Sequence, residues 1–209
     1  MSKTKILDHP LVACHLTTLR DKKTGCEVFR STVNRLSMLL AFAATRELEI
    51  TEKPIETPIQ KMIGSQLLNR IGLVPILRAG IGMVDAMLTM IPSAEVWHLG
   101  LYRDEETAQP VRYYSKLPES SPVDVAFVLD PMLATGGSAA MAIAALQDWG
   151  VPSIKMLSIL AAPEGIKRME AEFPDIEIHT CAVDKLLNED KFIVPGLGDA
   201  GDRIFNTSG

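Results

Sequence analysis

Short apolar runs alternate along most of the chain with segments whose apolar residues recur at helical spacing. The apolar runs are rich in β-branched residues, which is typical of buried strands. Strands are predicted over 73–77, 94–102, 123–129, 154–161 and 176–183, and helices over 9–20, 24–48, 61–69, 139–149 and 163–172, with a further helix ending at Met90. The stretch 48–58 is predicted to be extended, because Pro54 and Pro58 bound it. Strands that alternate with helices predict an α/β fold with a central parallel sheet covered on both faces.

Two further features define the organisation of the chain. Polar, turn-like residues at 104–107 separate two apolar stretches, so 101–117 is predicted to form a long β-hairpin. No internal repeat, low-complexity segment or linker divides the sequence. With 209 residues, of which 47% are hydrophobic, we expect a single domain over residues 1–209 with a substantial core.

The charge balance argues against some classes of partner. A formal net charge of −5 disfavours a surface for nucleic acid or for an anionic membrane. The longest uncharged run, 131–147, contains a Gly-Gly pair and is too short to span a membrane, and no long apolar stretch follows the basic start, so no secretory signal is expected. Cys14, Cys26 and Cys181 lie far apart without metal-ligand spacing. We therefore expect reduced thiols in a cytoplasmic protein.

The stretch 123–139 carries the most informative chemistry. An apolar strand ends at Asp130, a Thr-Gly-Gly-Ser turn follows at 135–138, and strong helix formers begin at Ala139. Glycines let the backbone approach a ligand closely, and the first N–H groups of a helix favour a phosphate. Asp130 could accept hydrogen bonds from sugar hydroxyls or hold Mg²⁺ through water. The alternative is an ordinary strand–helix turn capped by Ser138. A Walker A loop is excluded, because no Gly-Lys-Ser/Thr follows.

Two arginines directly follow predicted strands. Arg78 opens a loop of small residues, and Arg103 ends the strand before the predicted hairpin. Ligand sites of α/β folds form at the carboxyl ends of strands, and the guanidinium fork suits a diphosphate. A surface arginine beside a tight turn is the alternative for Arg78. The basic residues nearer the N-terminus are interpreted as a solvated face, with a subunit contact or an effector site as the alternative: Arg20, Lys22, Lys23, Arg30 and Arg35.

The tail over 192–203 combines glycines with two carboxylates. Gly196, Gly198 and Gly201 fit the pattern Gly-x-Gly-x-x-Gly, which alone suggests a dinucleotide fold. Only eight residues remain after Gly201, so no helix, second strand or ribose-binding acid can follow. The dinucleotide fold is therefore rejected.

Together these motifs resemble those of uracil phosphoribosyltransferases, a branch of the type I phosphoribosyltransferase family. Asp-Pro-Met-Leu-Ala-Thr-Gly-Gly-Ser at 130–138 resembles the loop that binds 5-phospho-α-D-ribose 1-diphosphate (PRPP), and the tail resembles the base-binding segment. Most type I enzymes have two adjacent acidic residues in this loop. Here Asp130 is followed by Pro131, as in the uracil branch, so Asp130 is expected to act alone.

The resemblance covers nearly the whole chain and implies the type I fold. In that fold a β-hairpin forms a hood over the diphosphate, and a C-terminal segment binds the base. The loop that begins at Arg78 resembles the pyrophosphate loop of the same family. We predict strained backbone there, with a cis peptide bond that does not involve proline near residues 77–79.

The resemblance also implies an activity, the conversion of uracil and PRPP to UMP and diphosphate in pyrimidine salvage. It assigns PRPP binding to Arg78, Arg103, Asp130, Pro131, Met132, Leu133, Ala134, Thr135, Gly136, Gly137, Ser138 and Asp199, and uracil binding to Ile193, Gly198, Asp199 and Ala200. Asp199 and Arg103 are the implied catalytic residues. Backbone groups of the tail would match the edge of uracil, so cytosine would leave buried groups unpaired. No general base is recognised, and catalysis is expected to depend on positioning and electrostatics.

Further expectations come from the same resemblance. Mg²⁺ should enter with the diphosphate of PRPP, GTP is a candidate activator, and a homodimer or a higher assembly is expected. Arg112 and Lys116 in the hairpin could contact phosphate or be solvated charges at a sheet edge. Two other functions stay open: a PRPP-binding regulator of nucleic acid, which the net charge disfavours, and a phosphoribosyltransferase for another base.

Overall fold

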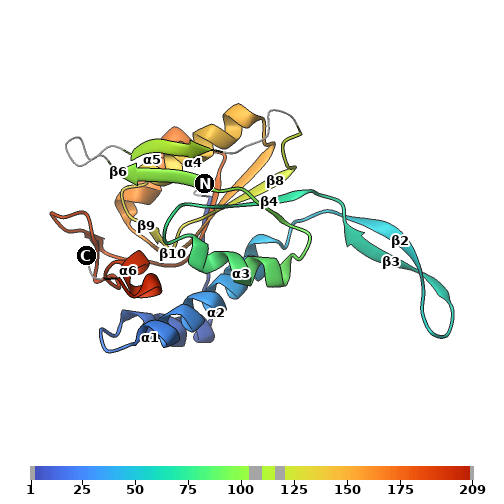
Figure 1. Cartoon of the computed structure of the whole chain (residues 1–209), viewed down its shortest axis with the longest axis horizontal. Coiled ribbons are helices and arrows are strands. Elements are labelled where there is room, and N and C mark those ends of the chain that lie inside the picture. The colour runs from blue at the N-terminus through green and yellow to red at the C-terminus, as the bar shows by residue number, and fades with distance from the viewer. Residues whose placement is uncertain (1–2, 104–109, 116–120, 208–209) are drawn as a thin grey trace.

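The computed structural model of the chain describes residues 3–103, 110–115 and 121–207, with the backbone alone for 99–103 and 110–115. Within this part, seven strands form one parallel sheet (Figure 1). In spatial order they are β1 (Thr4–Ile6), β11 (Glu177–Val183), β10 (Ser153–Ala161), β8 (Val125–Leu129), β4 (Ile71–Pro75) and β5 (Glu95–Val96), and β9 (Met132–Leu133) pairs with β10 beyond the end of β8. Because all pairs are parallel, the carboxyl ends of the strands share one edge of the sheet.

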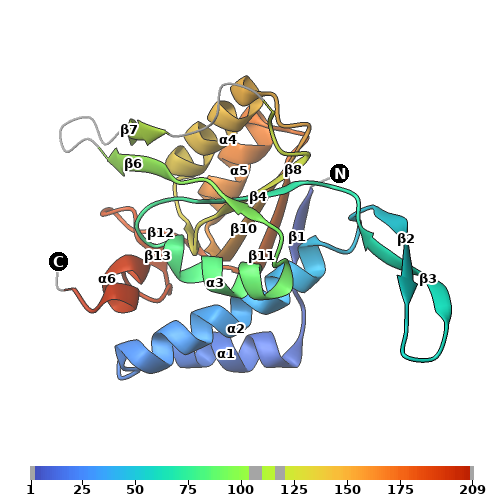
Figure 2. The ribbon, with the colours of Figure 1, turned by 45° about the vertical axis from the view of Figure 1, so that its right-hand side comes forward.

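Helices cover both faces of this sheet, as the sequence predicts (Figures 1 and 2). One face packs against α1 (Pro10–Arg20), α2 (Cys26–Ala44), α3 (Ile81–Met90) and α6 (Ala200–Phe205), and the other against α4 (Gly137–Trp149) and α5 (Pro163–Glu172). In β8, Phe127 and Leu129 belong to the first core cluster, whereas Ala126 and Val128 belong to the second, since side chains alternate along a strand. Among the described helices, none combines the length and the apolar character that a bilayer span requires.

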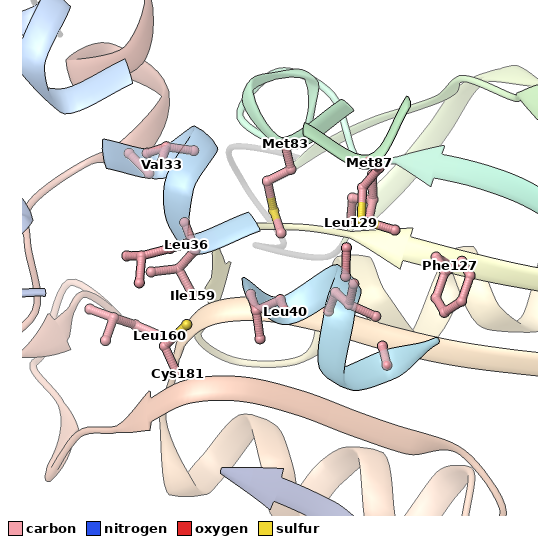
Figure 3. Packing of buried hydrophobic residues seen from close by; sticks show 14 of the residues in the cluster. Val33, Leu36, Leu40, Met83, Met87, Phe127, Leu129, Ile159, Leu160 and Cys181 are labelled. Carbon is pink, nitrogen blue, oxygen red and sulfur yellow. The ribbon is translucent and has the colours of Figure 1, made fainter. Parts of the chain in front are cut away.

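The core on the first face is organised by α2. Leu36 and Leu40 lie one helical turn apart and are fully buried in one cluster with Met83 and Met87 of α3 (Figure 3). Phe127 of β8 belongs to the same cluster. Each fully buried side chain of this size contributes about 1.5–3 kcal/mol. This packing holds the start of α3, and the loop before it, against the carboxyl end of β8.

The predicted helix over 61–69 is wrong. β2 (Ile50–Glu56) and β3 (Lys61–Leu67) form an antiparallel hairpin that projects from the body of the protein, called the arm below (Figure 1). Thr57 shapes its turn, because the Thr57 hydroxyl oxygen accepts hydrogen bonds from the amides of Ile59 (3.2 Å) and Gln60 (3.0 Å). Most residues of both strands are exposed, so no buried face imposed the alternation by which a strand is recognised.

The single strand predicted over 94–102 is two strands. β5 stays in the sheet, and the Trp97 amide donates to the Leu73 carbonyl (2.8 Å). The Trp97 ring then packs edge-on against Trp149, with centroids 5.9 Å apart. Beyond it, β6 (Leu99–Arg103) pairs antiparallel with β7 (Pro110–Ser115). The hairpin predicted over 101–117 is confirmed in its described part, while Lys116 and Leu117 lie outside the described residues.

The prediction that no helix follows Gly201 is wrong, because the tail contains a short helix. β12 (Leu186–Leu187) pairs antiparallel with β13 (Ile193–Val194), and the six-residue helix α6 follows. Asp199 caps the start of α6, and Asn206 ends it in the left-handed conformation at φ 57°. A cap at each end lets a helix form in very few residues. In the part of the chain described, no strand follows α6, so the rejection of a dinucleotide fold stands.

Candidate active site

The first loop of the site joins β8 to α4 at the carboxyl edge of the sheet. Asp130 follows β8, and its carboxylate accepts a hydrogen bond from the Met132 amide (3.2 Å). Gly136, at φ 77°, is the N-cap residue of α4. Ser138 lies inside the helix, so the alternative that Ser138 caps it is wrong. The glycine turn and the helix N-terminus that favour a phosphate are both present.

Asp130 titrates in an unusual range. Burial of the carboxyl group raises the pKa of Asp130 to about 7, the hydrogen bond from Met132 opposes the rise, and the negative charge of Asp199 adds to it. Near neutral pH, Asp130 therefore exists in both protonation states and can donate as well as accept a hydrogen bond.

The second loop joins β4 to α3. The cis peptide bond predicted here is present between Leu77 and Arg78. Gly80 packs directly against the end of β8: a Cβ atom at Gly80 would lie 2.3 Å from the Leu129 carbonyl oxygen and 2.7 Å from the Ile76 carbonyl oxygen. This close approach excludes any side chain at residue 80. It places the second loop beside Asp130, the residue after Leu129.

The third segment is the tail before α6. Gly196 and Gly198 have positive φ angles of 62° and 82°, which L side chains rarely adopt. Asp199 caps α6, because its carboxylate accepts a hydrogen bond from the Asp202 amide (2.8 Å). The backbone thus turns twice within a few residues, at the place where the sequence predicts that main-chain groups face a base.

The first loop and the tail border one cavity, and the second loop is bonded to the tail beside it. A cavity of about 240 Å³ lies between the first loop and the tail. Its lining includes Met132 and Ala134 from the first loop and Phe192, Ile193, Gly198, Asp199 and Ala200 from the tail. Arg78 Nη2 donates to Asp202 Oδ1 (3.2 Å), which links the second loop to the tail. The first loop and the tail, far apart in sequence, therefore border the same cavity.

The sequence as a whole matches one protein family. Residues 6–207 fit the family model for uracil phosphoribosyltransferase. The chain belongs to this family. The uracil phosphoribosyltransferases of Roseiflexus castenholzii and Levilactobacillus brevis are 53% and 52% identical to it, over 99% of this chain and 100% of each relative.

Solved structures agree with this assignment. A protein from Aquifex aeolicus has a TM-score of 0.92 at 38% identity, with 98% of this chain and 99% of that chain covered. The adenine phosphoribosyltransferase of Leishmania donovani has a TM-score of 0.58 at 13% identity, with 91% and 88% covered. The second likeness shows the fold alone. The predicted type I phosphoribosyltransferase fold is thus confirmed.

Of the residues that resemblance to the uracil phosphoribosyltransferase family assigns to the site, six line the cavity between the first loop and the tail: Met132, Ala134, Ile193, Gly198, Asp199 and Ala200. Asp130 and the turn at 135–138 belong to the first loop and Arg78 to the second, and these residues do not themselves line the cavity. Ile193 and Ala200 are buried, so main-chain groups are what they can present to a ligand. The roles of all these residues toward the two substrates stay predictions.

The hairpin residues assigned by resemblance to the family are described less completely. Arg103 is the last residue of β6, opposite Pro110, and Arg112 lies opposite Leu101. The side chains of both arginines fall outside the described part of the structure, as does the whole of Lys116. The contacts expected of these three cations with phosphate therefore stay predictions as well.

Sequence reasoning missed three residues that line the cavity, Asp190, Lys191 and Phe192, and one that contacts the second loop, Asp202. Phe192, with 46% of its surface exposed, lines the cavity. Asp202 pairs with Arg78 across 124 positions of sequence. Asp202 could have been noticed because it lies one helical turn from Asp199, but no local pattern signals a contact between segments this far apart.

The basic residues near the N-terminus do not form one solvated face. Arg20 is half-buried and binds Asp184 through two hydrogen bonds of 2.6 and 2.7 Å. Arg30 donates to the Ile204 carbonyl (3.0 Å). Among the described residues, Lys22, Lys23 and Arg35 are the members of this set that are exposed and whose side chains form no hydrogen bond or ion pair. The partner of Arg20 lies 164 positions away, which charge spacing along the chain cannot reveal.

Proposed function

We propose that the protein transfers the 5-phosphoribosyl group of PRPP to N1 of uracil, which gives UMP and diphosphate and salvages the free pyrimidine. The observation that carries this proposal is a cavity between the first loop and the tail, with Arg78 of the second loop bonded to the tail, in a chain that matches the uracil phosphoribosyltransferase family over residues 6–207. Proteins named uracil phosphoribosyltransferase share about half of their residues with it over their full length.

The first two loops would bind the donor. The turn at 135–138 and the N-terminus of α4 suit the 5′-phosphate, because backbone amides there favour an anion. Asp130 would hold the ribose hydroxyls, for which a carboxyl group that can both donate and accept is suited. Arg78 and Arg103 would bind the diphosphate through their guanidinium groups.

The reaction breaks the bond between C1 of the ribose and the diphosphate oxygen. C1 gains oxocarbenium character as the bond electrons leave with diphosphate, the N1 lone pair of uracil forms the new bond, and the N1 proton passes to solvent or to the departing diphosphate. Arg78 and Arg103 would stabilise the charge on the leaving group. Asp199 would orient the base and offset positive charge at C1. Positioning and electrostatics supply the rate enhancement in this scheme.

The tail would select the base. Uracil presents acceptors at O2 and O4 and a donor at N3, and main-chain groups of Ile193, Gly198 and Ala200 would pair with them. Cytosine presents a donor at position 4 and lacks the N3 proton, so it would leave buried main-chain groups unpaired. Sites of this type discriminate strongly between near-isosteres.

Mg²⁺ would arrive with the diphosphate. Within the described residues, no group of three or more His, Cys, Asp or Glu side chains could cage a metal ion. Asp190 and Asp199 line the cavity and Asp130 lies in the first loop, and one or two carboxylates with phosphate oxygens are usual ligands of Mg²⁺. This donor set fits a metal carried by the substrate. When bound, Mg²⁺ neutralises charge that develops on the diphosphate. Calorimetry of PRPP with and without Mg²⁺ tests this, since metal-free PRPP should bind more weakly.

A homodimer or a larger assembly is part of the proposal. The arm exposes several large apolar side chains: Ile50, Ile55, Ile59, Met62, Ile63, Leu67 and Leu68. A second copy of the chain would cover such a surface, because contiguous exposed apolar side chains mark interaction sites.

A cytoplasmic location is proposed from the net charge and the cysteine pattern. GTP is proposed as an activator, and initial rates with GTP, compared with ATP, test it.

One assay tests the central proposal. Purified protein with Mg²⁺ and PRPP is offered uracil, cytosine, hypoxanthine or adenine in separate reactions, and nucleotide products are separated by chromatography. We expect UMP from uracil and little product from the other bases. A product from a purine with none from uracil would replace this function with that of another base. Binding of RNA in a gel shift at physiological salt, without UMP formation, would favour a regulator.

A further inference from the structure

A buried ion pair fastens the turn that precedes the base-binding residues. Arg20 Nη2 and Nη1 donate to Asp184 Oδ1 (2.6 Å) and Oδ2 (2.7 Å). The same Oδ2 accepts the Gly196 amide (2.8 Å), and Arg20 Nη1 also donates to the Gly196 carbonyl (2.9 Å). One side-chain pair thus holds both polar backbone groups of Gly196. Only 6% of the Asp184 side chain and 26% of the Arg20 side chain are exposed.

A second arginine holds the next residue of the same turn. Arg203 Nη1 donates to the Leu197 carbonyl (2.8 Å) and to the carbonyl of Leu19 at the end of α1. Arg203 Nη2 donates to the Asp21 carbonyl (2.8 Å). The guanidinium carbon lies 4.3 Å from the ring centroid of Phe29 in α2, within the range of a cation–π contact. The C-terminal end of α1 is therefore the support to which residues 196 and 197 are attached.

The ion pair of Arg20 and Asp184 does not line the cleft. Arg20 ends α1, and Asp184 follows β11 directly. Neither residue lines the cavity between the first loop and the tail, whereas Gly198, Asp199 and Ala200 do. Any effect of Arg20 and Asp184 on a ligand must therefore pass through the path of the backbone between Gly196 and Ala200.

We propose that Arg20 and Asp184 are positioning residues that set the affinity and selectivity for uracil by fixing this backbone path. The inference rests on the proposed function, in which main-chain groups of the tail read the base. A side chain can change rotamer to keep a hydrogen bond, but a main-chain group can point only where the chain takes it. A two-pronged arginine–carboxylate contact has a narrow geometry, so it fixes the chain more closely than a single bond does.

Kinetics separate this role from simple stabilisation. A residue that only holds the fold together lowers the amount of folded enzyme and leaves KM for both substrates unchanged. Loss of the proposed positioning instead raises KM for uracil, because interactions with the base weaken while the PRPP site at residues 78 and 130–138 stays intact. It also reduces the preference for uracil over cytosine, since main-chain groups of the tail that have moved no longer bind uracil better than cytosine.

Two variants test the proposal against a matched control. Asp184→Asn removes the charge that Arg20 binds, and Arg20→Lys keeps the charge but loses the fork. The control is Glu177→Gln at the opposite end of β11, where Glu177 contacts the buried Lys155 at 3.3 Å with side-chain exposures of 23% and 10%. This second pair is similarly buried and lies away from the cleft, so it reports the effect of breaking an ion pair alone. Melting temperature is measured for each protein.

We expect KM for uracil to rise about tenfold in Asp184→Asn and less in Arg20→Lys, with KM for PRPP within about twofold of wild type, as misplacement of binding groups predicts. Glu177→Gln should lower the melting temperature but leave KM for uracil and the preference for uracil over cytosine unchanged. If Asp184→Asn does not fold, Arg20→Lys supplies the test. The proposal is overturned if folded variants keep the wild-type KM for uracil, or if the control shifts KM equally. Failure of the wild-type enzyme to make UMP would instead overturn the proposed function.

Discussion

Arg78 Nη2 donates to Asp202 Oδ1 at 3.2 Å, so a charge-assisted hydrogen bond joins the second loop to the tail. The side chain of Arg78 is 62% exposed and that of Asp202 is 25% exposed. A pair as open as this contributes only about 0–1 kcal/mol to stability. Its importance lies in orientation, because the bond uses one N–H group of the guanidinium and leaves its other donors for a ligand.

Substitution of the two partners should therefore have unequal effects. Arg78→Ala should weaken PRPP binding by roughly tenfold or more, because a charged hydrogen bond to phosphate contributes about 1.5–3 kcal/mol. Asp202→Asn keeps an acceptor for Arg78 and should change the affinity by less than about threefold. Isothermal titration calorimetry with PRPP and Mg²⁺ measures both. An unchanged affinity in Arg78→Ala would remove Arg78 from the donor site.

Asp199→Asn should lower turnover much more than stability. Asparagine caps a helix about as well as aspartate, so α6 keeps its cap and the free energy of unfolding should change by less than about 0.5 kcal/mol. The negative charge is lost, and we expect kcat to fall by roughly a hundredfold if that charge acts at C1. Steady-state rates give kcat, and urea unfolding gives the free energy of unfolding. Asp199→Ala is the control that loses the cap as well, and an unchanged kcat in Asp199→Asn would exclude Asp199 from the mechanism.

The pKa of Asp130 makes stability depend on pH. In the folded protein it is raised to about 7 from 3.8, so the folded state holds a proton that the unfolded state releases at lower pH. The stabilising contribution is complete below pH 4 and is lost as the pH rises toward 7 and beyond. Asp130→Asn cannot lose a proton. Its melting temperature relative to wild type should therefore be higher at pH 8 than at pH 5, and a difference that does not change with pH would contradict the shift.

The arm should govern assembly. Ile59 is 93% exposed and Ile63 is 55% exposed, and an aspartate at each position would place charge on a surface that a second copy is expected to cover. We expect the double variant Ile59→Asp/Ile63→Asp to sediment with a lower mass than wild type. Lys53→Ala, an exposed change on the same arm, is the control and should not alter the mass. Equal masses for all three proteins would show that the arm is not the interface.

Gly80→Ala should be strongly destabilising. The new methyl group would lie 2.3 Å from the Leu129 carbonyl oxygen, so the second loop would have to move away from β8. Overpacking of this kind costs at least about 2 kcal/mol. Gly25→Ala is the control, because a Cβ at Gly25 meets no atom within 4 Å. Thermal unfolding of both variants measures the difference, and equal melting temperatures would show that the two loops do not touch in solution.

Much of the fold follows from local patterns. α5 begins at Pro163 and ends at Glu172 as predicted, because proline favours the first turn and apolar spacing marks the buried side. β8 and the loop after it were also predicted. A strand buried on both faces has few polar residues, and Asp130 marks its end. Where burial dictates the residue type, the sequence carries the signal.

The rest depends on contacts that no window of sequence contains. The stretch 48–58 was correctly predicted to be extended and contains β2, but β3 has no buried face, so its apolar residues did not show a strand pattern. Arg20 resembled its exposed neighbours Lys22 and Lys23, and only the folded chain places it on Asp184. The break after Trp97 depends on the packing of that ring against Trp149. For Arg20 and Trp97, the contact partner lies far away in sequence.

The close packing of Gly80 against β8 also limits how the two connections that form this site can change in length. With no gap between the second loop and the carbonyl of Leu129, an insertion or deletion in either connection would displace the other. Related chains should therefore keep the same number of residues in both connections, and size variation should concentrate elsewhere, as in the turn of the arm at 57–60.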